Sequence, residues 1–277
     1  MKVAIYAVNA GGGFGNKRAR YIAHSMAAGL RRCGVHYVER SRFDGVVADV
    51  AVAYGWVHAD IFHAYRSAGA HYLFWDLGYW GRRPQTAPED GYHRLAIDDW
   101  DTAVHMRRAC LTDRFEQLGL TVGDGPREAR DVLVAGMSPK AAGTHGYAYG
   151  QWEERIRASL TRIRPDLPVI MRPKPNKRAV PQIPIYEVLQ TTRLLVTHHS
   201  NAAIDALLLG VPVYAVKGVG RLASADTLDA AALEHPYELN YAARLQLLAD
   251  VAYAQWTPQE MRSGEAWQHA LSILRNR

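Results

Sequence analysis

The chain has 277 residues, of which 48% are hydrophobic and 22% are charged, so a folded globular protein is expected and disorder as its main state is excluded. No stretch approaches the ~18 uncharged apolar residues of a membrane span, the N-terminal apolar run is too short for a secretory signal, and two cysteines cannot form a disulfide framework. We therefore expect a reduced, cytoplasmic protein whose excess of 33 Lys and Arg over 27 Asp and Glu favours anionic partners.

The first half of the chain alternates strand and helix patterns. A β-branched apolar run, a glycine-rich turn and a helical stretch follow one another at the N-terminus, which is the opening of a βαβ unit. A segment rich in Gly, Pro and Arg at 78–91 is predicted to be a loop. Strands are predicted over 2–8, 46–54, 71–75 and 95–97, and helices over 17–33, 58–68 and 113–119.

A second alternating series begins near residue 131. Gly210 ends one of its helices and fits a left-handed C-terminal position. Strands are predicted over 132–135, 169–171, 193–197 and 211–216, helices over 151–164, 185–190 and 201–209, a loop over 140–150, and a helical pattern over 237–277 that is interrupted near Thr257 and Gly264.

Two βα series of about equal size predict an α/β protein with two Rossmann-like domains, whose parallel sheets face each other across a cleft. The boundary is expected near residues 122–130, with domains of 1–125 and 126–277. Ligands of such sheets bind beyond the carboxyl ends of the strands, so the active site is expected in the cleft.

The most informative segment is the turn after the strand at 193–197. That strand runs into His198 and His199, and Ser200 is a candidate N-cap for the next helix. The helix N-terminus offers an anion site, while Asn201 and Asp205 share one helix face, where a carboxylate is placed to accept hydrogen bonds from two ribose hydroxyls. The alternative is an ordinary strand–helix–strand unit with solvated histidines, and a metal role lacks a third spaced ligand.

This segment resembles the nucleotide-sugar-binding signature of GT-B-fold glycosyltransferases. The resemblance is carried by Ser200, by Asp205 followed by Ala206, and by Gly210-Val211-Pro212-Val213. It implies a nucleotide-sugar donor, an acidic residue on the donor ribose at position 205, where the family usually has Glu, and a last helix that crosses back onto the first domain. The retaining subgroup's earlier Glu would fall on Thr197, and its absence favours an inverting mechanism.

Two further elements precede this signature in the order expected for the family. Met171–Pro175 resembles an Arg-Pro-His-Pro element, which implies that Lys174 replaces the histidine on the donor phosphate; the alternative is a Pro-stiffened basic loop. A Gly, Ser and Thr-rich loop follows the strand at 132–135. The donor-binding residues predicted in this way are Gly13, Ser138, Lys140, Arg172, Lys174, His199, Ser200, Asn201 and Asp205.

The glycine-rich turn at Gly11–Gly15 matches neither a Walker A loop nor a dinucleotide fingerprint. In GT-B proteins a turn at this position lets the backbone approach the donor or the acceptor. Lys17 and Arg18 then open the helix, where positive charge opposes the helix dipole, so an anionic ligand is expected. A solvated basic face is the alternative.

Asp76 directly follows an apolar strand and is the first candidate for a catalytic base. Inverting glycosyl transfer needs a group that takes the proton of the acceptor hydroxyl. A turn-capping aspartate beside core aromatic residues is the alternative. Asp98, Asp99 and Asp101 are second candidates, and His93 is another.

Basic clusters with interleaved aromatic residues in the first half are typical of a nucleic-acid surface. The segments 76–82 and 255–267 are similar to phage-type DNA glycosyltransferases. That resemblance implies transfer of a glucose-like hexose from a UDP-sugar to hydroxymethylated pyrimidine in double-stranded DNA, with Lys17, Arg18, Tyr79, Arg82 and Arg83 binding the acceptor.

Other interpretations stay open at this point. The acceptor could be a polysaccharide, a lipid-linked glycan or a small molecule, and the protein could instead be a nucleotide-sugar epimerase or a non-catalytic nucleotide- or DNA-binding protein. No metal-binding residue is predicted and no divalent metal is expected to be required. No clear amphipathic basic helix indicates a membrane partner.

Overall fold

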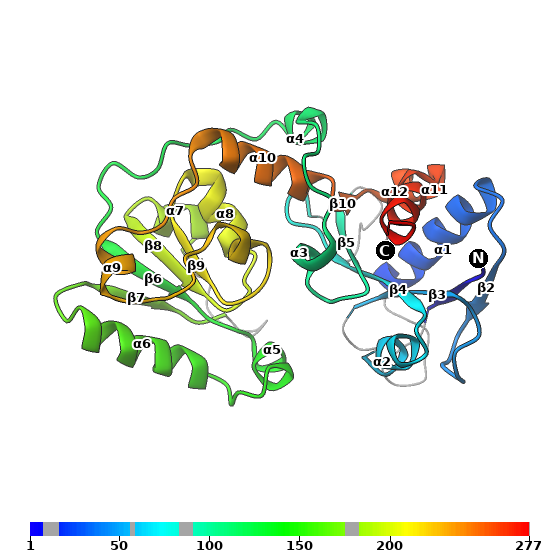
Figure 1. Cartoon of the computed structure of the whole chain (residues 1–277), viewed down its shortest axis with the longest axis horizontal. Coiled ribbons are helices and arrows are strands. Elements are labelled where there is room, and N and C mark those ends of the chain that lie inside the picture. Colours follow the sequence, from blue (N-terminus) through cyan, green and yellow to red (C-terminus); the bar gives the residue numbers. More distant parts are fainter. Residues whose placement is uncertain (8–16, 56–58, 83–90, 175–182, 277) are drawn as a thin grey trace. The chain divides into compact units, whose positions relative to one another are not determined.

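The computed structural model describes residues 1–7, 17–55, 59–82, 91–174 and 183–276 (Figure 1). The chain divides into two compact units, one made of residues 1–114 with 250–277 and the other of residues 115–249. The described residues form a six-stranded sheet in the first unit and a four-stranded sheet in the second. The α/β class predicted from the alternation of strands and helices is confirmed.

The first sheet has the strand order β10-β5-β4-β3-β1-β2. Its strands β1 to β4 are parallel. The strands are β1 (Val3–Tyr6), β2 (Tyr37–Arg40), β3 (Val50–Tyr54), β4 (His71–Leu77), β5 (His93–Ile97) and β10 (Gln255–Trp256), and the helices of this unit are α1 (Lys17–Arg32), α2 (Ala59–Ser67), α3 (Thr102–His105), α11 (Pro258–Ser263) and α12 (Glu265–Leu274).

The first sheet departs from the parallel arrangement at one side. β5 runs antiparallel to β4, and β10 runs antiparallel to β5. The chain passes from β4 to β5 through the segment rich in Gly, Pro and Arg, whose sequence has no apolar helical pattern that could cover the sheet. As a result, the start of β5, and not its end, lies beside the carboxyl end of β4.

The first sheet is covered by helices on both faces (Figure 1). α1, α11 and α12 pack on the face that carries Val52 and Trp75. α2 packs on the other face, which carries Ala53 and Phe74. This division follows from the alternation of side chains along a strand, and it explains the uninterrupted apolar sequence of β3.

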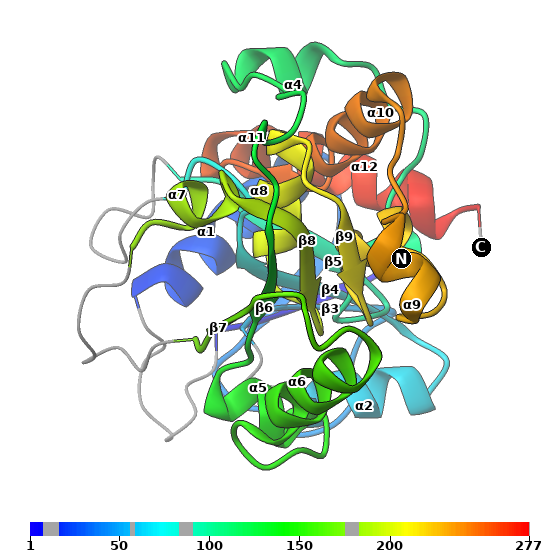
Figure 2. The same cartoon turned by 90° about the vertical axis from the view of Figure 1, so that its left-hand side faces the viewer.

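The second sheet is parallel throughout its described strands, with the order β7-β6-β8-β9. Figure 2 shows β6, β8 and β9 side by side, and in Figure 1 α6 and α8 lie on opposite faces of this sheet. The strands are β6 (Asp131–Ala135), β7 (Val169–Arg172), β8 (Thr192–Thr197) and β9 (Val213–Ala215). The helices are α5 (Pro139–Thr144), α6 (Gln151–Ile163), α7 (Ile185–Leu189), α8 (Ala202–Leu209), the 3-10 helix η3 (Val219–Ala223) and α9 (Ala230–Glu234). Two more helices, α4 (Asp113–Gln117) and α10 (Tyr241–Ala252), each contain one of the two positions at which the chain passes from one unit to the other.

The segment 140–150, predicted to be a loop, contains most of the helix α5. Ser138 caps this helix, since its hydroxyl oxygen accepts a hydrogen bond from the Ala141 N–H at 3.2 Å. Pro139 follows at the first helical position, where its missing N–H costs nothing. A Ser-Pro cap signal therefore outweighed the glycines that favoured a loop.

The units divide at different positions from the expected domains of 1–125 and 126–277. The second unit begins at Phe115, and residues 250–277 pack in the first unit, as the family resemblance implied for the last helix. Met261 and Trp267 are fully buried there in the same core as α1, and β10 extends the first sheet. A helical pattern in the sequence shows that a segment has an apolar face, but it does not show which sheet that face covers.

Candidate functional site

Both units have the same order for their parallel strands. In each unit the second strand lies beside the first on one side, and the third lies beside the first on the other. The order reverses between β1 and β3 in the first unit and between β6 and β8 in the second. In open α/β sheets, ligands bind at the carboxyl ends of the strands at such a reversal.

The turn after β8 lies at the reversal of the second unit. The Thr197 hydroxyl donates to the Ala135 carbonyl of β6 at 3.0 Å and accepts from the Ser200 N–H at 3.2 Å. The Ser200 hydroxyl oxygen in turn accepts from the Ala202 N–H, the first of α8, at 3.2 Å. Asn201, and not Ser200, is the N-cap residue of α8, but the hydroxyl that satisfies a helix N–H is that of Ser200.

α8 ends as the sequence predicts. Gly210 has a φ of 81° and its N–H bonds to the Ala206 and Leu207 carbonyls. A Cβ at this position would lie 2.4 Å from the Gly125 nitrogen. Both the left-handed backbone and this close approach require glycine.

The predicted ribose ligand, Asp205, is half-buried in the first turn of α8. Its carboxylate accepts a hydrogen bond from the Tyr186 hydroxyl of α7 at 3.0 Å. Arg172 is half-buried at the carboxyl end of β7, beside β6, while Lys140 and Lys174 are exposed. Four of the predicted donor-binding residues therefore lie at or just after the carboxyl ends of strands in the second unit. They are Ser138, Arg172, Ser200 and Asp205.

Three histidines gather at the same end of this sheet. His145 caps the C-terminus of α5, and His198 and His199 follow β8. The Nδ1 atoms of His198 and His199 are 2.9 Å apart, and one nitrogen from each of the three rings lies within 4.8 Å of the others. Burial, with Lys217 nearby, lowers the pKa of His145, and burial with His145 and Lys217 lowers the pKa of His198 to about 4. Both shifts favour the neutral form of the two rings.

The loop after β6 depends on a residue that the sequence did not single out. Glu153, in the first turn of α6, is only 8% exposed, and its carboxylate accepts the Met137 N–H at 2.6 Å. A Cβ on Gly136 would lie 2.6 Å from that carboxylate oxygen. Gly136 and Glu153 together fix the start of the loop that leads to Ser138. An acidic residue in the first turn of a helix was the available signal.

Asp76 lies near the carboxyl end of β4 in the first unit. Its carboxylate forms an ion pair with Arg94 at 3.2 Å and accepts the Leu77 N–H at 2.8 Å. Burial, with Asp76 nearby, raises the pKa of Tyr54 to about 12. Burial and the Arg18 charge lower the pKa of His93 to about 4. Sequence patterns did not identify Arg94 because the direction of β5 was unknown.

The second-choice carboxylates lie at the opposite end of the same strands. β5 is antiparallel, so the residues that follow it lie beside the start of β4. Asp98 accepts the Tyr72 N–H at 2.8 Å and pairs with His71 at 2.7 Å. Asp99 and Asp101 have the Asp-x-Asp spacing of a metal motif, but both accept backbone N–H groups. These three aspartates therefore stabilise the local backbone.

The predicted acceptor-binding residues that the structure describes do not form an exposed surface on which bases could stack. Tyr79 is 5% exposed, with its N–H bonded to Gln255 at 2.8 Å. Arg18 is 6% exposed. Arg82 folds back onto its own loop and donates to the Gly78 carbonyl at 2.6 Å and the Tyr79 carbonyl at 3.0 Å. Gly13, Arg83 and the side chain of Lys17 lie outside the described residues.

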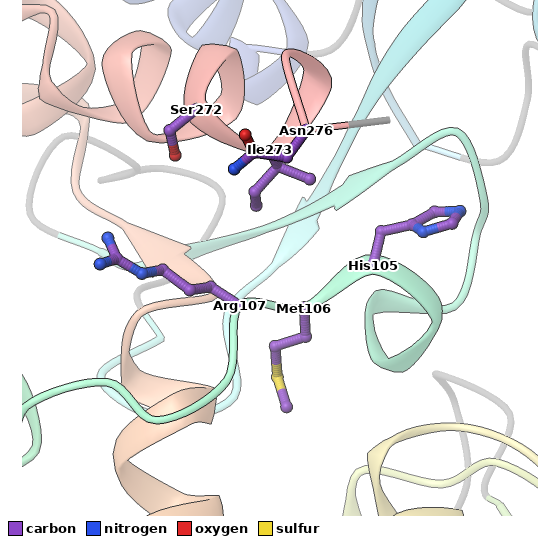
Figure 3. Close-up of a pocket in the computed structure, with 6 residues that line it drawn as sticks. All are labelled: His105, Met106, Arg107, Ser272, Ile273 and Asn276. Atoms are coloured by element: carbon purple, nitrogen blue, oxygen red, sulfur yellow. The ribbon is translucent and has the colours of Figure 1, made fainter.

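The first unit also contains a hollow away from these candidates (Figure 3). It lies between the segment after α3 and the C-terminal end of α12. Its lining includes none of the predicted catalytic, donor-binding or acceptor-binding residues, and the figure shows His105 and Met106 on one side of it and Ile273 on the other. We assign it no function. The lining residues are His105, Met106, Arg107, Ser272, Ile273 and Asn276.

Two solved structures share the fold of this chain. Thermosulfurimonas dismutans KpsC, beta Kdo 2,4 transferase, is 14% identical with a TM-score of 0.50 over 92% of this chain and 91% of that one. The beta Kdo 2,7 transferase of the same organism's KpsC is 10% identical with a TM-score of 0.51 over 97% and 99% of the two chains. The fold is therefore that of solved glycosyltransferases, as the sequence resemblance implied. No family model and no curated protein matches the chain.

None of the described helices combines the length and the apolar character needed to cross a bilayer.

Proposed function

We propose that this protein is a glycosyltransferase that moves a sugar from a nucleotide-sugar donor to a hydroxyl group of an acceptor. The observation that carries the proposal is the position of the Ser200-to-Asp205 turn at the strand reversal of the second unit. A fold shared with solved glycosyltransferases over more than 90% of the chain supports it.

The donor would bind to the second unit through its charged diphosphate. Ser200 and His199 lie at the start of α8, where the helix dipole attracts anions. Arg172 and Lys174 after β7 would add positive charge, and Lys140, with the Ser138 hydroxyl, would contribute from the loop after β6. Asp205, one turn into α8, would accept hydrogen bonds from the ribose hydroxyls.

The chemistry would take place with Asp76 of the first unit as the base. The Asp76 carboxylate would remove the proton from the acceptor hydroxyl as that oxygen attacks the anomeric carbon, and the nucleotide would leave with the bonding electrons. The result is inversion at the anomeric centre. Arg94 orients the carboxylate through their ion pair.

Asp205→Ala is expected to weaken donor binding about 10- to 100-fold, because hydrogen bonds to a charged acceptor contribute about 1.5–3 kcal/mol. Calorimetry with a UDP-sugar measures this effect. Tyr186→Phe is the matched control, since it removes only the hydroxyl that bonds to Asp205 and should change the affinity less than about threefold. Unchanged affinity of the Asp205 variant would rule out the ribose contact.

The donor class can be tested directly. A thermal-shift screen with UDP-, GDP-, CMP- and TDP-linked sugars should show stabilisation by one nucleotide class, because a ligand that binds only the folded state raises the unfolding temperature. A UDP-hexose is the expected donor. Kdo-bearing nucleotides belong in the screen because the solved structures are Kdo transferases by name. If no nucleotide sugar stabilises the protein or transfers its sugar, the proposal is wrong.

The acceptor we propose is hydroxymethylated pyrimidine in double-stranded DNA, with a glycan as the second candidate. DNA is favoured by exposed arginines of the first unit, including Arg20, Arg31, Arg32, Arg107 and Arg108. The burial of Tyr79 and Trp80 counts against DNA, because it leaves these two rings unavailable for stacking on bases, and it keeps the glycan as the second candidate.

Salt dependence separates the two acceptors. If DNA is the acceptor, its affinity should fall steeply, by about 10³-fold or more between 50 and 200 mM salt, for six or more phosphate contacts. A fluorescence-anisotropy titration of a labelled duplex gives this slope. Transfer to a neutral oligosaccharide without salt-dependent duplex binding would instead establish the glycan. Among the described residues, Cys33 and Cys110 do not form a disulfide, and the cytoplasm is the compartment that we propose.

A further inference from the structure

We propose that His145, His198 and His199 form a binding site for a divalent transition-metal ion such as Zn²⁺. The sequence places His145 more than fifty residues before the other two, so their spacing does not suggest a shared site. The fold brings them together because β6 and β8 are neighbours in the sheet. The site shares His199 with the proposed donor site, but the observations that support it and the experiment that tests it involve no sugar.

The spacing of the nitrogen atoms is close to that of metal ligands. Imidazole nitrogens lie about 2.0–2.1 Å from Zn²⁺, so two ligands of one tetrahedral ion are about 3.3 Å apart. The Nδ1 atoms of His198 and His199 are 2.9 Å apart, and one ring nitrogen from each of the three histidines lies within 4.8 Å of the other two. Shifts of about 1–2 Å in the side chains would bring all three nitrogens to the ligand spacing of one ion.

The three rings lie close together with their planes tilted against one another. The centroids of His145 and His198 are 4.4 Å apart with 39° between their planes, and those of His145 and His199 are 4.8 Å apart with 56°. His198 and His199 are nearly perpendicular, at 87°. Rings at these angles can direct one nitrogen each toward a common point.

The backbone around the cluster is held in place by several hydrogen bonds. The His145 N–H bonds to carbonyls at the end of α5, and the His198 carbonyl accepts the Lys217 N–H at 2.7 Å. Trp152 and Tyr147 contact the His198 ring edge-on, at centroid distances of 5.8 and 6.0 Å. A site supported in this way loses little freedom when a ligand binds.

The donor atoms determine which ions fit. Imidazole nitrogen suits Zn²⁺, Co²⁺, Ni²⁺ and Cu²⁺, whereas Mg²⁺ and Ca²⁺ prefer oxygen ligands. Among the described residues the metal-ligating group consists of these three histidines, so a tetrahedral ion would keep one position open for water or an anion. The charge of Lys217, which lies near His145 and His198, opposes a bound cation and sets the affinity below that of a site with an acidic ligand.

The test is a titration of the full-length, tag-free protein with Co²⁺, followed by its visible absorption, and with Zn²⁺ by calorimetry. One ion should bind per chain. His145→Ala and His199→Ala should each weaken binding at least about 100-fold, because even the loss of a residue that only supports a metal ligand costs about 10- to 100-fold. The control is His235→Ala, which replaces an exposed histidine of the same unit. This variant should bind the metal ion with the affinity of the wild type.

Three results would overturn the proposal. They are the absence of stoichiometric Co²⁺ or Zn²⁺ binding, unchanged affinity in both variants, and binding of Mg²⁺ or inorganic phosphate in place of Zn²⁺. Circular dichroism of His145→Ala and His199→Ala, whose replaced side chains are only half-buried, checks that the loss is not unfolding. Because the titration contains no nucleotide sugar, a negative result would not count against the proposed sugar transfer. A negative donor screen would likewise not count against the metal site.

Discussion

Asp76→Asn is expected to lower turnover by about 10²- to 10⁴-fold, the usual contribution of a positioned base, while donor affinity persists. The Asp76 carboxylate accepts the Leu77 N–H with Oδ1 and the Arg94 side chain with Oδ2, so an amide, with its single oxygen, keeps the Leu77 contact and loses the one to Arg94. The variant also loses the capacity to accept a proton, which is the larger effect on turnover. Turnover with a saturating donor, and calorimetry with the same donor, measure the two quantities separately.

The matched control for this variant is Asp98→Asn. Asp98 lies at the other end of the same β4–β5 pair and forms a similar partner contact, to His71. Its replacement should cost about 1 kcal/mol of stability, as is typical for a lost hydrogen bond, and leave turnover within about twofold. Near-normal turnover of Asp76→Asn would remove Asp76 as the base. Equal losses in the two variants would show that the strands had been disturbed instead.

Gly29→Ala is expected to destabilise the first unit, although alanine normally stabilises a helix over glycine by about 1 kcal/mol. Gly29 lies within α1, and a Cβ there would be 2.0 Å from the Met261 carbonyl oxygen and 3.3 Å from the Gly264 Cα. Both neighbours are backbone, so α1 and α11 would have to separate. Overpacking of this kind costs about 1–3 kcal/mol or more, which corresponds to a fall of roughly 5 °C in Tm.

Gly143→Ala shows what the same substitution does without a neighbour. Gly143 lies in α5, and a Cβ added there would meet no atom of another part of the described chain within 4 Å. Helix propensity alone then predicts a gain of about 0.5–1 kcal/mol. Thermal unfolding followed by circular dichroism measures both variants. If Gly29→Ala raises Tm as much as Gly143→Ala does, the close approach of α1 and α11 is absent in solution.

The sequence predicts the parts of this fold that local patterns determine. The buried strands β3 and β8 consist largely of apolar and β-branched residues and lie at or near the predicted positions. Gly210 ends α8 because its left-handed backbone is a local requirement. The strand–turn–helix unit that contains Ser200 and Asp205 was likewise predicted from local patterns, since each of its signals lies within a few residues of the next.

Features that depend on pairing between distant segments were not predictable. The sequence of β5 predicts a short apolar strand but not its direction, which is set by its antiparallel pairing with β4. That direction places Arg94 beside Asp76 and moves Asp98 to the other end of the sheet. Tyr79 lies in a segment whose composition is typical of a binding surface. In the structure its N–H is buried and donates to the side chain of Gln255, 176 residues later. His145 joins His198 because of the order of two strands in the sheet.

The return of the last residues to the first unit affects the order in which the protein can fold during synthesis. Residues 115–249 form a continuous unit, whereas the first unit needs residues 250–277 as well. Until the ribosome has made that segment, α1 and Trp75 lack the apolar cover that Met261 and Trp267 provide. The middle of the chain can therefore reach its final fold before the beginning, and the earlier part must wait with apolar surface exposed to chaperones and proteases.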